Sequence, residues 1–189
     1  MKGFNDLHNL CINIVYDRYR KILLADKSFL REPRALELIP KYGWLFITDW
    51  GEMPHISRMN MDGSNPRHII TKDIAWPNGL TIDYITEKLF WADANYDYIA
   101  MADLDGSNIH KIIDESLPHP FAITTFVDKI YWTDWEYNAI YEARKFSGEK
   151  RARLALLHHR PMDIVVYHSL RQPQCESNLM WGKCLKFYD

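Results

Sequence analysis

The feature that most constrains the fold is a tetrapeptide that recurs in degenerate form along the chain. Tyr131-Trp132-Thr133-Asp134 has two upstream relatives, Phe46-Ile47-Thr48-Asp49 and Phe90-Trp91-Ala92-Asp93, and the spacings between the aspartates are 44 and 41 residues. Two further markers keep this period, a proline before an apolar stretch and a glycine in a turn. They are Pro33, Pro77, Pro120 and Pro161, and Gly63, Gly106 and Gly148. Three markers with one period of about 40 residues indicate a copied supersecondary unit, as in the blades of β-propellers.

The best-preserved repeat, residues 76–118, reads as four short strands. Its first strand alternates apolar and polar residues, and its second is wholly apolar, which predicts a strand covered on both faces. Asp105-Gly106 predicts a tight hairpin, because glycine tolerates left-handed backbone angles. The predicted strands are residues 80–84, 89–92, 98–104 and 109–113. Residues 33–72 read in the same way, and residues 120–157 do so with Phe146-Ser147-Gly148-Glu149 as the turn. The chain is therefore predicted to be all-β.

Composition bounds the classes of function. The 189 residues suit one domain, with 47% hydrophobic residues for a core and 14% aromatic residues to fill the space between stacked sheets. The net charge of −2 gives no electrostatic basis for binding nucleic acid or an anionic membrane. No run of about 18 apolar residues is present to cross a bilayer, and the start of the chain lacks the apolar stretch of a secretion signal.

The three cysteines are Cys11, Cys175 and Cys184. Because the number is odd, at least one is unpaired or pairs outside this chain. Cys175 and Cys184 follow the last predicted strand. They either open a disulfide-rich module or are two free thiols in a tail, and their spacing leaves both readings open.

Several longer strings resemble the YWTD propeller of the low-density lipoprotein receptor family, in particular that of its large endocytic receptor-related members. Among them are Met61-Asp62-Gly63-Ser64-Asn65, Trp76-Pro77-Asn78-Gly79-Leu80 and Ile130-Tyr131-Trp132-Thr133-Asp134-Trp135. The string that begins at Arg160 is similar to that family's closing strand and its exit toward an EGF-like module. The resemblance divides the chain into a poorly matching segment at residues 1–30, YWTD propeller repeats at residues 31–170 and the truncated start of an EGF-like module at residues 171–189.

The family propeller has six blades, whereas only three full repeats stand between Pro33 and Arg160. We therefore expect a partial YWTD-type β-propeller with three full four-stranded blades plus an incomplete or shared fourth. Residues 12–16 and 20–24 could join residues 162–167 in that fourth blade, as the family joins its two termini in one blade. An open arc or strained partial ring is expected rather than a four-bladed closure.

Strand order predicts which loops share a face. Loops between the second and third strands emerge beside the connections from a fourth strand to the next blade. These segments gather aromatic, carboxylate and amide side chains, the mixture found at protein-binding hot spots. By resemblance, this is the face on which family propellers engage protein ligands or their own cysteine-rich repeats. The candidate partner-binding residues are Trp50, Glu52, His55, Trp76, Asn78, Tyr96, His119, Trp135 and Glu136. The opposite face receives the Asp-Gly hairpins, which are predicted to be plain turns.

Some of these residues also have structural interpretations. Trp76 either packs in the gap between blades or contacts a partner. Asn78 either binds a ligand or stabilises the turn before Gly79. Asp49, Asp93 and Asp134 end apolar strands, and we expect them to accept backbone hydrogen bonds from a neighbouring blade. These three aspartates are interpreted as a structural motif.

Histidine titrates near endosomal acidity. By resemblance, family propellers help expel ligand in acidic endosomes. His55 and His119 are the candidates on the predicted binding face. The hypothesis is that replacing both with Gln removes the pH dependence of binding.

The expected function is that of a protein-binding propeller module in the extracellular or endosomal-lumenal part of an endocytic receptor. The alternatives are a Wnt co-receptor or basement-membrane-type structural propeller, or a fragment without a function of its own. No nucleophile elbow, phosphate loop, dinucleotide fingerprint or zinc spacing is present, so no catalytic residue, metal or cofactor is predicted. A catalytic propeller with acids lining a central channel is the alternative by fold class.

Overall fold

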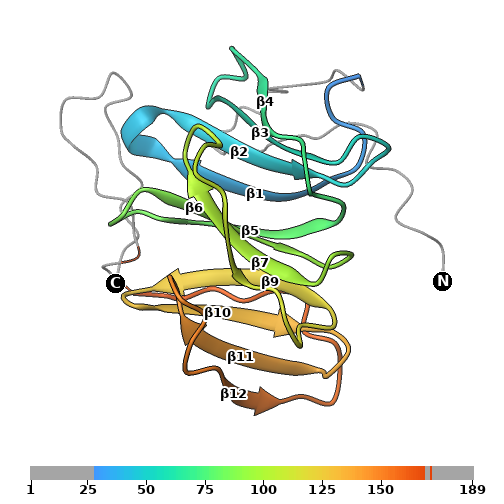
Figure 1. Cartoon of the computed structure of the whole chain (residues 1–189). Helices are drawn as coiled ribbons and strands as arrows, with labels where there is room; N and C mark the ends of the chain where they lie inside the picture. Colours follow the sequence, from blue (N-terminus) through green and yellow to red (C-terminus); the bar gives the residue numbers. More distant parts are fainter. Residues whose placement is uncertain (1–27, 169–170, 172–189) are drawn as a thin grey trace, which may run out of the picture.

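The computed structural model describes residues 28–168 and Arg171, and these form three four-stranded antiparallel sheets. The sheets follow one another along the chain and are here called blades 1, 2 and 3 (Figure 1). Blade 1 holds β1 (Pro33–Ile39), β2 (Trp44–Asp49), β3 (His55–Asn60) and β4 (Arg67–Ile70), with a short 3-10 helix at Pro40–Tyr42. Blade 2 holds β5 (Pro77–Asp83), β6 (Lys88–Asp93), β7 (Tyr98–Asp103) and β8 (His110–Ile113). Blade 3 holds β9 (Pro120–Phe126), β10 (Lys129–Asp134), β11 (Ala139–Arg144) and β12 (Ala152–Leu156). The all-β prediction and its repeat boundaries are confirmed.

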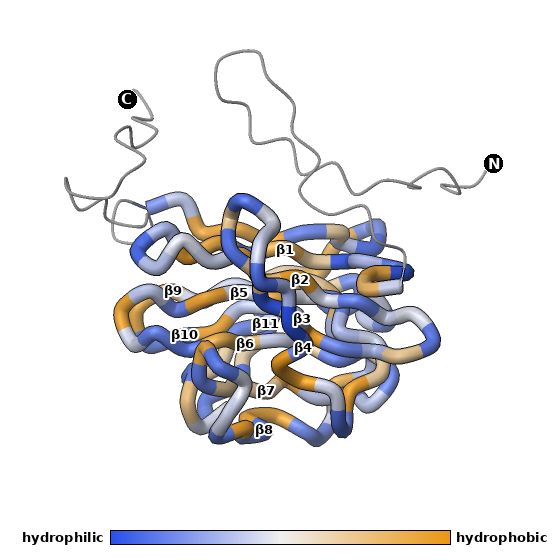
Figure 2. The backbone as a smooth tube through the Cα atoms, turned by 90° about the horizontal axis from the view of Figure 1, so that it is seen from above, coloured by the Kyte–Doolittle hydropathy of each residue, from blue (hydrophilic) through white to orange (hydrophobic). Residues whose placement is uncertain are grey.

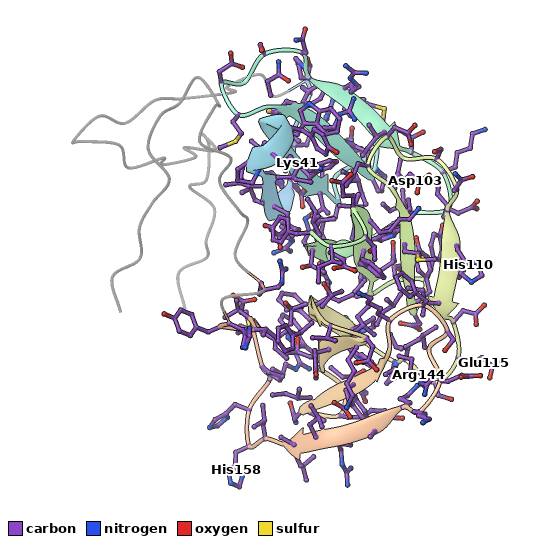
Figure 3. The ribbon with its side chains drawn as sticks, turned by 90° about the vertical axis from the view of Figure 1, so that its left-hand side faces the viewer. Lys41, Asp103, His110, Glu115, Arg144 and His158 are labelled. Carbon is purple, nitrogen blue, oxygen red and sulfur yellow. The ribbon has the colours of Figure 1, made fainter. Side chains whose placement is uncertain are left out.

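The blades are arranged around an arc. The first strands, β1, β5 and β9, pack against one another in that order. In Figure 3 the three sheets follow an arc that is open on the left, which agrees with the expected partial ring. Residues 162–167 belong to no sheet of the described chain. Residues 12–16 and 20–24 lie outside the described residues, so their pairing in a shared fourth blade stays a prediction.

The hydrophobic core lies between the blades. Phe46 of β2 packs with Trp91 of β6 between blades 1 and 2, and Phe90 packs with Trp132 of β10 between blades 2 and 3. All four side chains are at most 1% exposed. Because neighbouring residues of a strand point to opposite sides of the sheet, Phe90 and Trp91 serve different interfaces. Figure 2 shows hydrophobic stretches along the strands, with hydrophilic residues at many of the connecting turns.

The hairpins between third and fourth strands are not plain turns. A Cβ atom on Gly106 of blade 2 would lie 2.2 Å from the Ile69 carbonyl oxygen of blade 1. Gly148 of blade 3 repeats this approach to the Ile112 carbonyl of blade 2, at 2.4 Å. Both glycines have positive φ, +88° and +67°. The sequence predicted the left-handed turn at Gly106, but it gave no sign that the hairpin also packs against the preceding blade.

The repeated aspartates fasten the linkers between blades. Asp93 Oδ2 accepts hydrogen bonds from the backbone N–H groups of Ala75 and Trp76, at 2.7 and 3.1 Å, and Oδ1 accepts from those of Asn95 and Tyr96, at 3.0 Å each. Asp49 and Asp134 occupy the corresponding positions: Asp49 accepts from the amides of Arg31, Glu32 and Gly51, and Asp134 accepts from those of His119 and Tyr137. The prediction that the donor amides lie in a neighbouring blade is wrong. They lie in the linker that precedes the same blade and in its loop between the second and third strands, because the aspartate ends the second strand next to both segments.

Beyond the last strand, Arg171 returns to the first two blades. Its Nη2 donates to Thr81 Oγ1 of β5 at 2.6 Å and lies 3.5 Å from a carboxylate oxygen of Glu37 on β1. Burial raises the pKa of Glu37, and the Arg171 charge opposes that shift. Burial, together with the charge of Glu37, raises the pKa of Tyr84 to about 12. The segment that leaves the propeller is thus tied to the inner strands.

Replacing Gly106 with Ala tests the contact between hairpin and blade. We expect the substitution to lower the free energy of unfolding by about 3 kcal/mol, because the Cβ meets backbone atoms and the left-handed angle is strained. Gly43→Ala is the matched control: its φ is +64° but nothing lies within 4 Å of the added Cβ, so only the strain of about 1 kcal/mol remains. Urea unfolding measures both. Equal losses would contradict a packing role for the hairpin.

Replacing Asp93 with Ala tests the linker anchor. Four backbone N–H groups lose their acceptor, and we expect a loss of about 3–4 kcal/mol in the free energy of unfolding. Asp105→Ala removes a carboxylate from the same blade whose hydrogen bonds go only to Ser107 in an exposed turn, so we expect it to leave the free energy of unfolding nearly unchanged. A similar cost for both variants in urea unfolding would show that Asp93 does not anchor the linker.

Candidate protein-binding face

The predicted loops do emerge on one face. In each blade the residue after the second strand donates a backbone hydrogen bond to the linker that precedes the first strand. The bonds run from Trp50 to Glu32, from Ala94 to Trp76 and from Trp135 to His119, at 3.0–3.2 Å. We call the surface formed by these loops and linkers the linker face, and the opposite surface the hairpin face. The aspartate anchors hold both kinds of segment in place.

A cluster of two tryptophans and an arginine bridges blades 1 and 2 on the linker face. The rings of Trp50 and Trp76 meet edge to face with centroids 5.7 Å apart. The Arg34 guanidinium lies 3.5 Å from the Trp50 ring centroid, a cation–π contact. Trp76 nevertheless stays 40% exposed. The two interpretations of Trp76 are therefore not exclusive, since it packs across the boundary between blades and also presents surface.

A second aromatic cluster lies on blade 3. The Trp135 ring stacks on Phe121 at 4.0 Å and on His119 at 5.5 Å between centroids. Its Nε1–H donates to the Pro161 carbonyl at 2.9 Å, and the Arg160 guanidinium lies 5.5 Å from the ring. Although Trp50 and Trp135 lie in loops, both rings pack against neighbouring side chains. Each remains partly exposed.

The charged and tyrosine candidates lie around these clusters. Glu52 forms a 2.9 Å ion pair with Arg31, and its side chain is 79% exposed. Tyr96 is 55% exposed in the loop of blade 2, and Glu136 is exposed in that of blade 3. An exposed pair such as Glu52–Arg31 contributes little to stability and is free to be rearranged by a partner.

Two buried oxygens on blade 2 have no hydrogen-bond partner. Asn78 lies in β5 rather than in a turn and is 8% exposed, and its Oδ1 is an unpaired acceptor. Asp97 Oδ1, in the loop after β6, is also unpaired. Burial raises the pKa of Asp97, and the nearby His119 opposes the rise. Since buried polar atoms are nearly always paired, these two oxygens are candidate acceptors for a donor that reaches them when the side chains turn outward.

His55 does not lie in a loop of this face. It begins β3, is 6% exposed, and its Nδ1 is 2.7 Å from the Met53 carbonyl oxygen while Nε2 has no partner. Its ring centroid is 4.0 Å from that of His68, which stacks on Phe29. His68 as a whole residue is exposed, but partial desolvation of its ring and the neighbouring His55 lower the pKa of His68. The structure thus pairs His55 with His68 and stacks His119 on Trp135, so the two predicted histidines belong to separate clusters.

The candidate residues predicted from the sequence do not include Arg34, Phe121 or Asp97. A positional signal was available for the first two, because Arg34, Asn78 and Phe121 each directly follow the repeated proline. The residue after the proline contacts the loop tryptophan in two blades: Arg34 contacts Trp50 in blade 1, and Phe121 contacts Trp135 in blade 3. Asp97 had no such signal, because its burial depends on the packing of a loop.

The described residues were compared with what a metal site and a membrane-spanning helix require. No three His, Cys, Asp or Glu side chains in this part of the chain are grouped to hold a metal ion. None of its helical segments is long and apolar enough to span a membrane. The linker face offers aromatic surface, cations and unpaired acceptors, which suit recognition of another molecule.

Comparison with known proteins agrees with this architecture. The family model for the low-density lipoprotein receptor repeat class B matches residues 43–84 and 87–126. The chain is 33% identical over 183 residues to the vitellogenin receptor of Solenopsis invicta and 34% identical over 160 residues to vitellogenin receptor Yl of Drosophila melanogaster. It covers 10% and 8% of these receptors, which match 96% and 82% of it. The human low-density lipoprotein receptor-related protein 5-like protein is 34% identical over 78% of the chain, which spans 57% of that protein.

Solved structures share the fold. A chain of the nidogen–laminin complex superposes with a TM-score of 0.68 and 27% identity, over 77% of this chain and 55% of that one. A luciferin-regenerating enzyme superposes with a TM-score of 0.62 over 77% of this chain and 54% of its own, but at 14% identity it shows the fold alone. Repeats, blades and relatives lead to one conclusion. The chain carries low-density lipoprotein receptor class B (YWTD) repeats, forms part of a propeller of that type and is homologous to the vitellogenin receptors.

Proposed function

We propose that the linker face binds a protein ligand of the kind carried by vitellogenin receptors. The observation that supports this most directly is the cluster of Arg34, Trp50 and Trp76, which is fixed by packing yet partly open to solvent. Tryptophan and arginine dominate binding energies at protein interfaces, and a side chain held rigidly loses little entropy on binding. The relatives' names supply the ligand class.

The unpaired oxygens of Asn78 and Asp97 favour a ligand that offers hydrogen-bond donors. Both are acceptors, so a partner's amide or ammonium group would satisfy them. The exposed Tyr96 and Glu136 lie in the loops around them. We place this face on the extracellular or endosomal-lumenal side of the receptor.

A second candidate is a structural role like that of the nidogen–laminin complex, favoured by the superposition on that structure. The two functions differ in ligand. Binding of laminin in preference to vitellogenin would replace the first proposal with the second.

Acid-dependent ligand release is the finer part of the proposal. It is supported by the contact between His55 and His68, since two imidazoles this close resist being charged together. Protonation in an acidic compartment would strain the edge of blade 1 beside Asp49, whose carboxylate holds the linker at Arg31 and Glu32.

The tryptophan cluster is tested by Trp76→Ala. We expect this variant to bind an insect vitellogenin about 10-fold to 30-fold more weakly than the wild type in surface plasmon resonance, since a central aromatic anchor is worth about 2 kcal/mol. Phe146→Ala is the matched control, because Phe146 is an aromatic of similar exposure, 44%, in a hairpin turn of the opposite face. Equal losses in the two variants would argue against binding through the linker face.

The histidine pair predicts a pH dependence of stability. The pKa of His68 is lower in the folded chain than in the unfolded chain, so the unfolded chain binds the proton more tightly. The contribution of His68 to the free energy of unfolding is therefore fully present above the ordinary histidine pKa of about 6.5, and it is lost as the pH falls below that value. We expect the melting temperature to drop between pH 7.5 and pH 5.0, and to drop less in His68→Gln. His110→Gln, on the exposed end of β8 (Figure 3), should follow the wild type. An identical drop in all three proteins would exclude the pair.

A further inference from the structure

On the hairpin face, the corner between blades 1 and 2 departs from the repeat. At the start of the second strand, blades 2 and 3 carry lysines that pair with a carboxylate of the third strand, Lys88 with Asp103 and Lys129 with Glu142. Blade 1 carries Trp44 at this position instead. An aromatic ring thus stands where the other two blades have an ion pair.

Arg58 is the second departure at this corner. It lies in the third strand, where blades 2 and 3 have Met101 and Glu142. Its guanidinium lies 4.0 Å from the Trp44 ring centroid, and its Nη1 donates to the Leu104 carbonyl of blade 2 at 3.2 Å. The residue is 8% exposed, and this is its only hydrogen bond to the described residues. Because a guanidinium has several N–H donors, others remain for a bound molecule.

A pocket of about 390 Å³ opens beside Trp44 and Arg58. Blade 1 also lines it with Tyr42, whose ring centroid lies 4.9 Å from that of Trp44 and which is 39% exposed. Blade 2 contributes three carboxylates, those of Glu87, Asp103 and Asp105. The volume and the aromatic lining suit a small molecule or one unit of a larger molecule.

The charges that line the pocket are balanced. Glu87 pairs with Lys41 at 2.6 Å, and Asp103 pairs with Lys88. Arg58 is the cation that matches the third carboxylate of the lining. A ligand with a large net charge of either sign therefore gains little here, and the pocket favours a neutral polar ligand.

Three groups are available to hold such a ligand. The Tyr42 ring presents apolar surface, and a 2.7 Å hydrogen bond from its hydroxyl to Glu87 fixes it. Among the described residues, Asp105 binds only Ser107 and only through Oδ1, so its Oδ2 is an exposed acceptor. Arg58 supplies donors. A pyranose ring matches all three groups, because its C–H face packs on an aromatic ring and its hydroxyls both donate and accept.

We propose that the pocket formed by Tyr42, Trp44, Arg58 and Asp105 binds a neutral sugar unit of a glycan. The sugar packs on the Tyr42 ring, donates a hydroxyl hydrogen to Asp105 Oδ2 and accepts from the Arg58 guanidinium. Because the pocket lies on the hairpin face, this site is separate from the linker face and does not rest on the protein ligand proposed for that face.

The probes are the methyl glycosides of glucose, galactose, mannose and N-acetylglucosamine, used with the full 189-residue chain. In saturation-transfer difference NMR we expect at least one glycoside to bind saturably with a Kd of about 1–10 mM, as is usual for so small a ligand in an open pocket. Absence of saturable binding by all of these glycosides at about 50 mM would overturn the proposal.

Variants of the chain locate the binding. Tyr42→Ala removes the aromatic ring and Asp105→Ala removes the acceptor, and we expect each to weaken binding of the preferred glycoside about 5-fold to 10-fold. Phe146→Ala is the matched control, because Phe146 is an aromatic of similar exposure, 44%, in the hairpin of blade 3, and it should bind the glycoside like the wild type.

Unchanged affinity in both Tyr42→Ala and Asp105→Ala would show that the sugar binds elsewhere and would overturn the assignment of the pocket. Should Tyr42→Ala unfold the chain, Asp105→Ala still decides, since this carboxylate binds only within an exposed turn.

Two further comparisons test the class of ligand. Glucuronic acid and glucosamine each carry one charged group, and we expect neither to bind more tightly than the neutral glycosides. A gain of about 10-fold for either would overturn the assignment to a neutral sugar. A glycoprotein that ends in the preferred sugar should bind, and its enzymatically deglycosylated form should not. Equal binding of the two forms would show that the protein part is recognised and would contradict a glycan ligand.

Discussion

The structure depends on one constraint, which is that a four-stranded sheet covers its broad faces only with the sheets beside it. Trp91 fills the interface between blades 1 and 2 together with Phe46. Trp132 fills the interface between blades 2 and 3 together with Phe90. Close backbone approach at Gly106 and Gly148 sets the separation on the hairpin side. A buried ion pair between Lys145 of blade 3 and Asp83 of blade 2 also connects these two blades. Each blade is therefore stable only as part of a series.

The same constraint shapes the linker face. A linker must leave the outer strand of one blade and reach the inner strand of the next, which leaves its backbone amides without strand partners. The aspartate at the end of the second strand supplies the acceptor, as Asp93 does for Ala75 and Trp76. A fixed linker in turn fixes Trp76 against Trp50. Rigid aromatic surface on this face is thus a consequence of how the blades are joined.

The end of blade 3 shows what happens where the series stops among the described residues. Ile140 and Leu154 keep the apolar character of their counterparts Ile99 and Ile112, although no described sheet covers them. Residues 164–167 keep the alternation of a first strand, although no described strand pairs with them. Local sequence encodes the face of a blade, while only a neighbour buries it.

The sequence by itself determined the repeat, the four strands of each blade and the face on which the loops gather. These are local properties: alternation sets a strand, and Asp-Gly or a repeated proline sets its ends. The tertiary structure alone decided the roles of individual side chains. His55 is a buried strand residue in contact with His68, Asn78 is a buried strand residue as well, and the Trp135 indole donates a hydrogen bond to the Pro161 carbonyl. Such outcomes depend on contacts between residues far apart in the chain, whose distances no local pattern specifies.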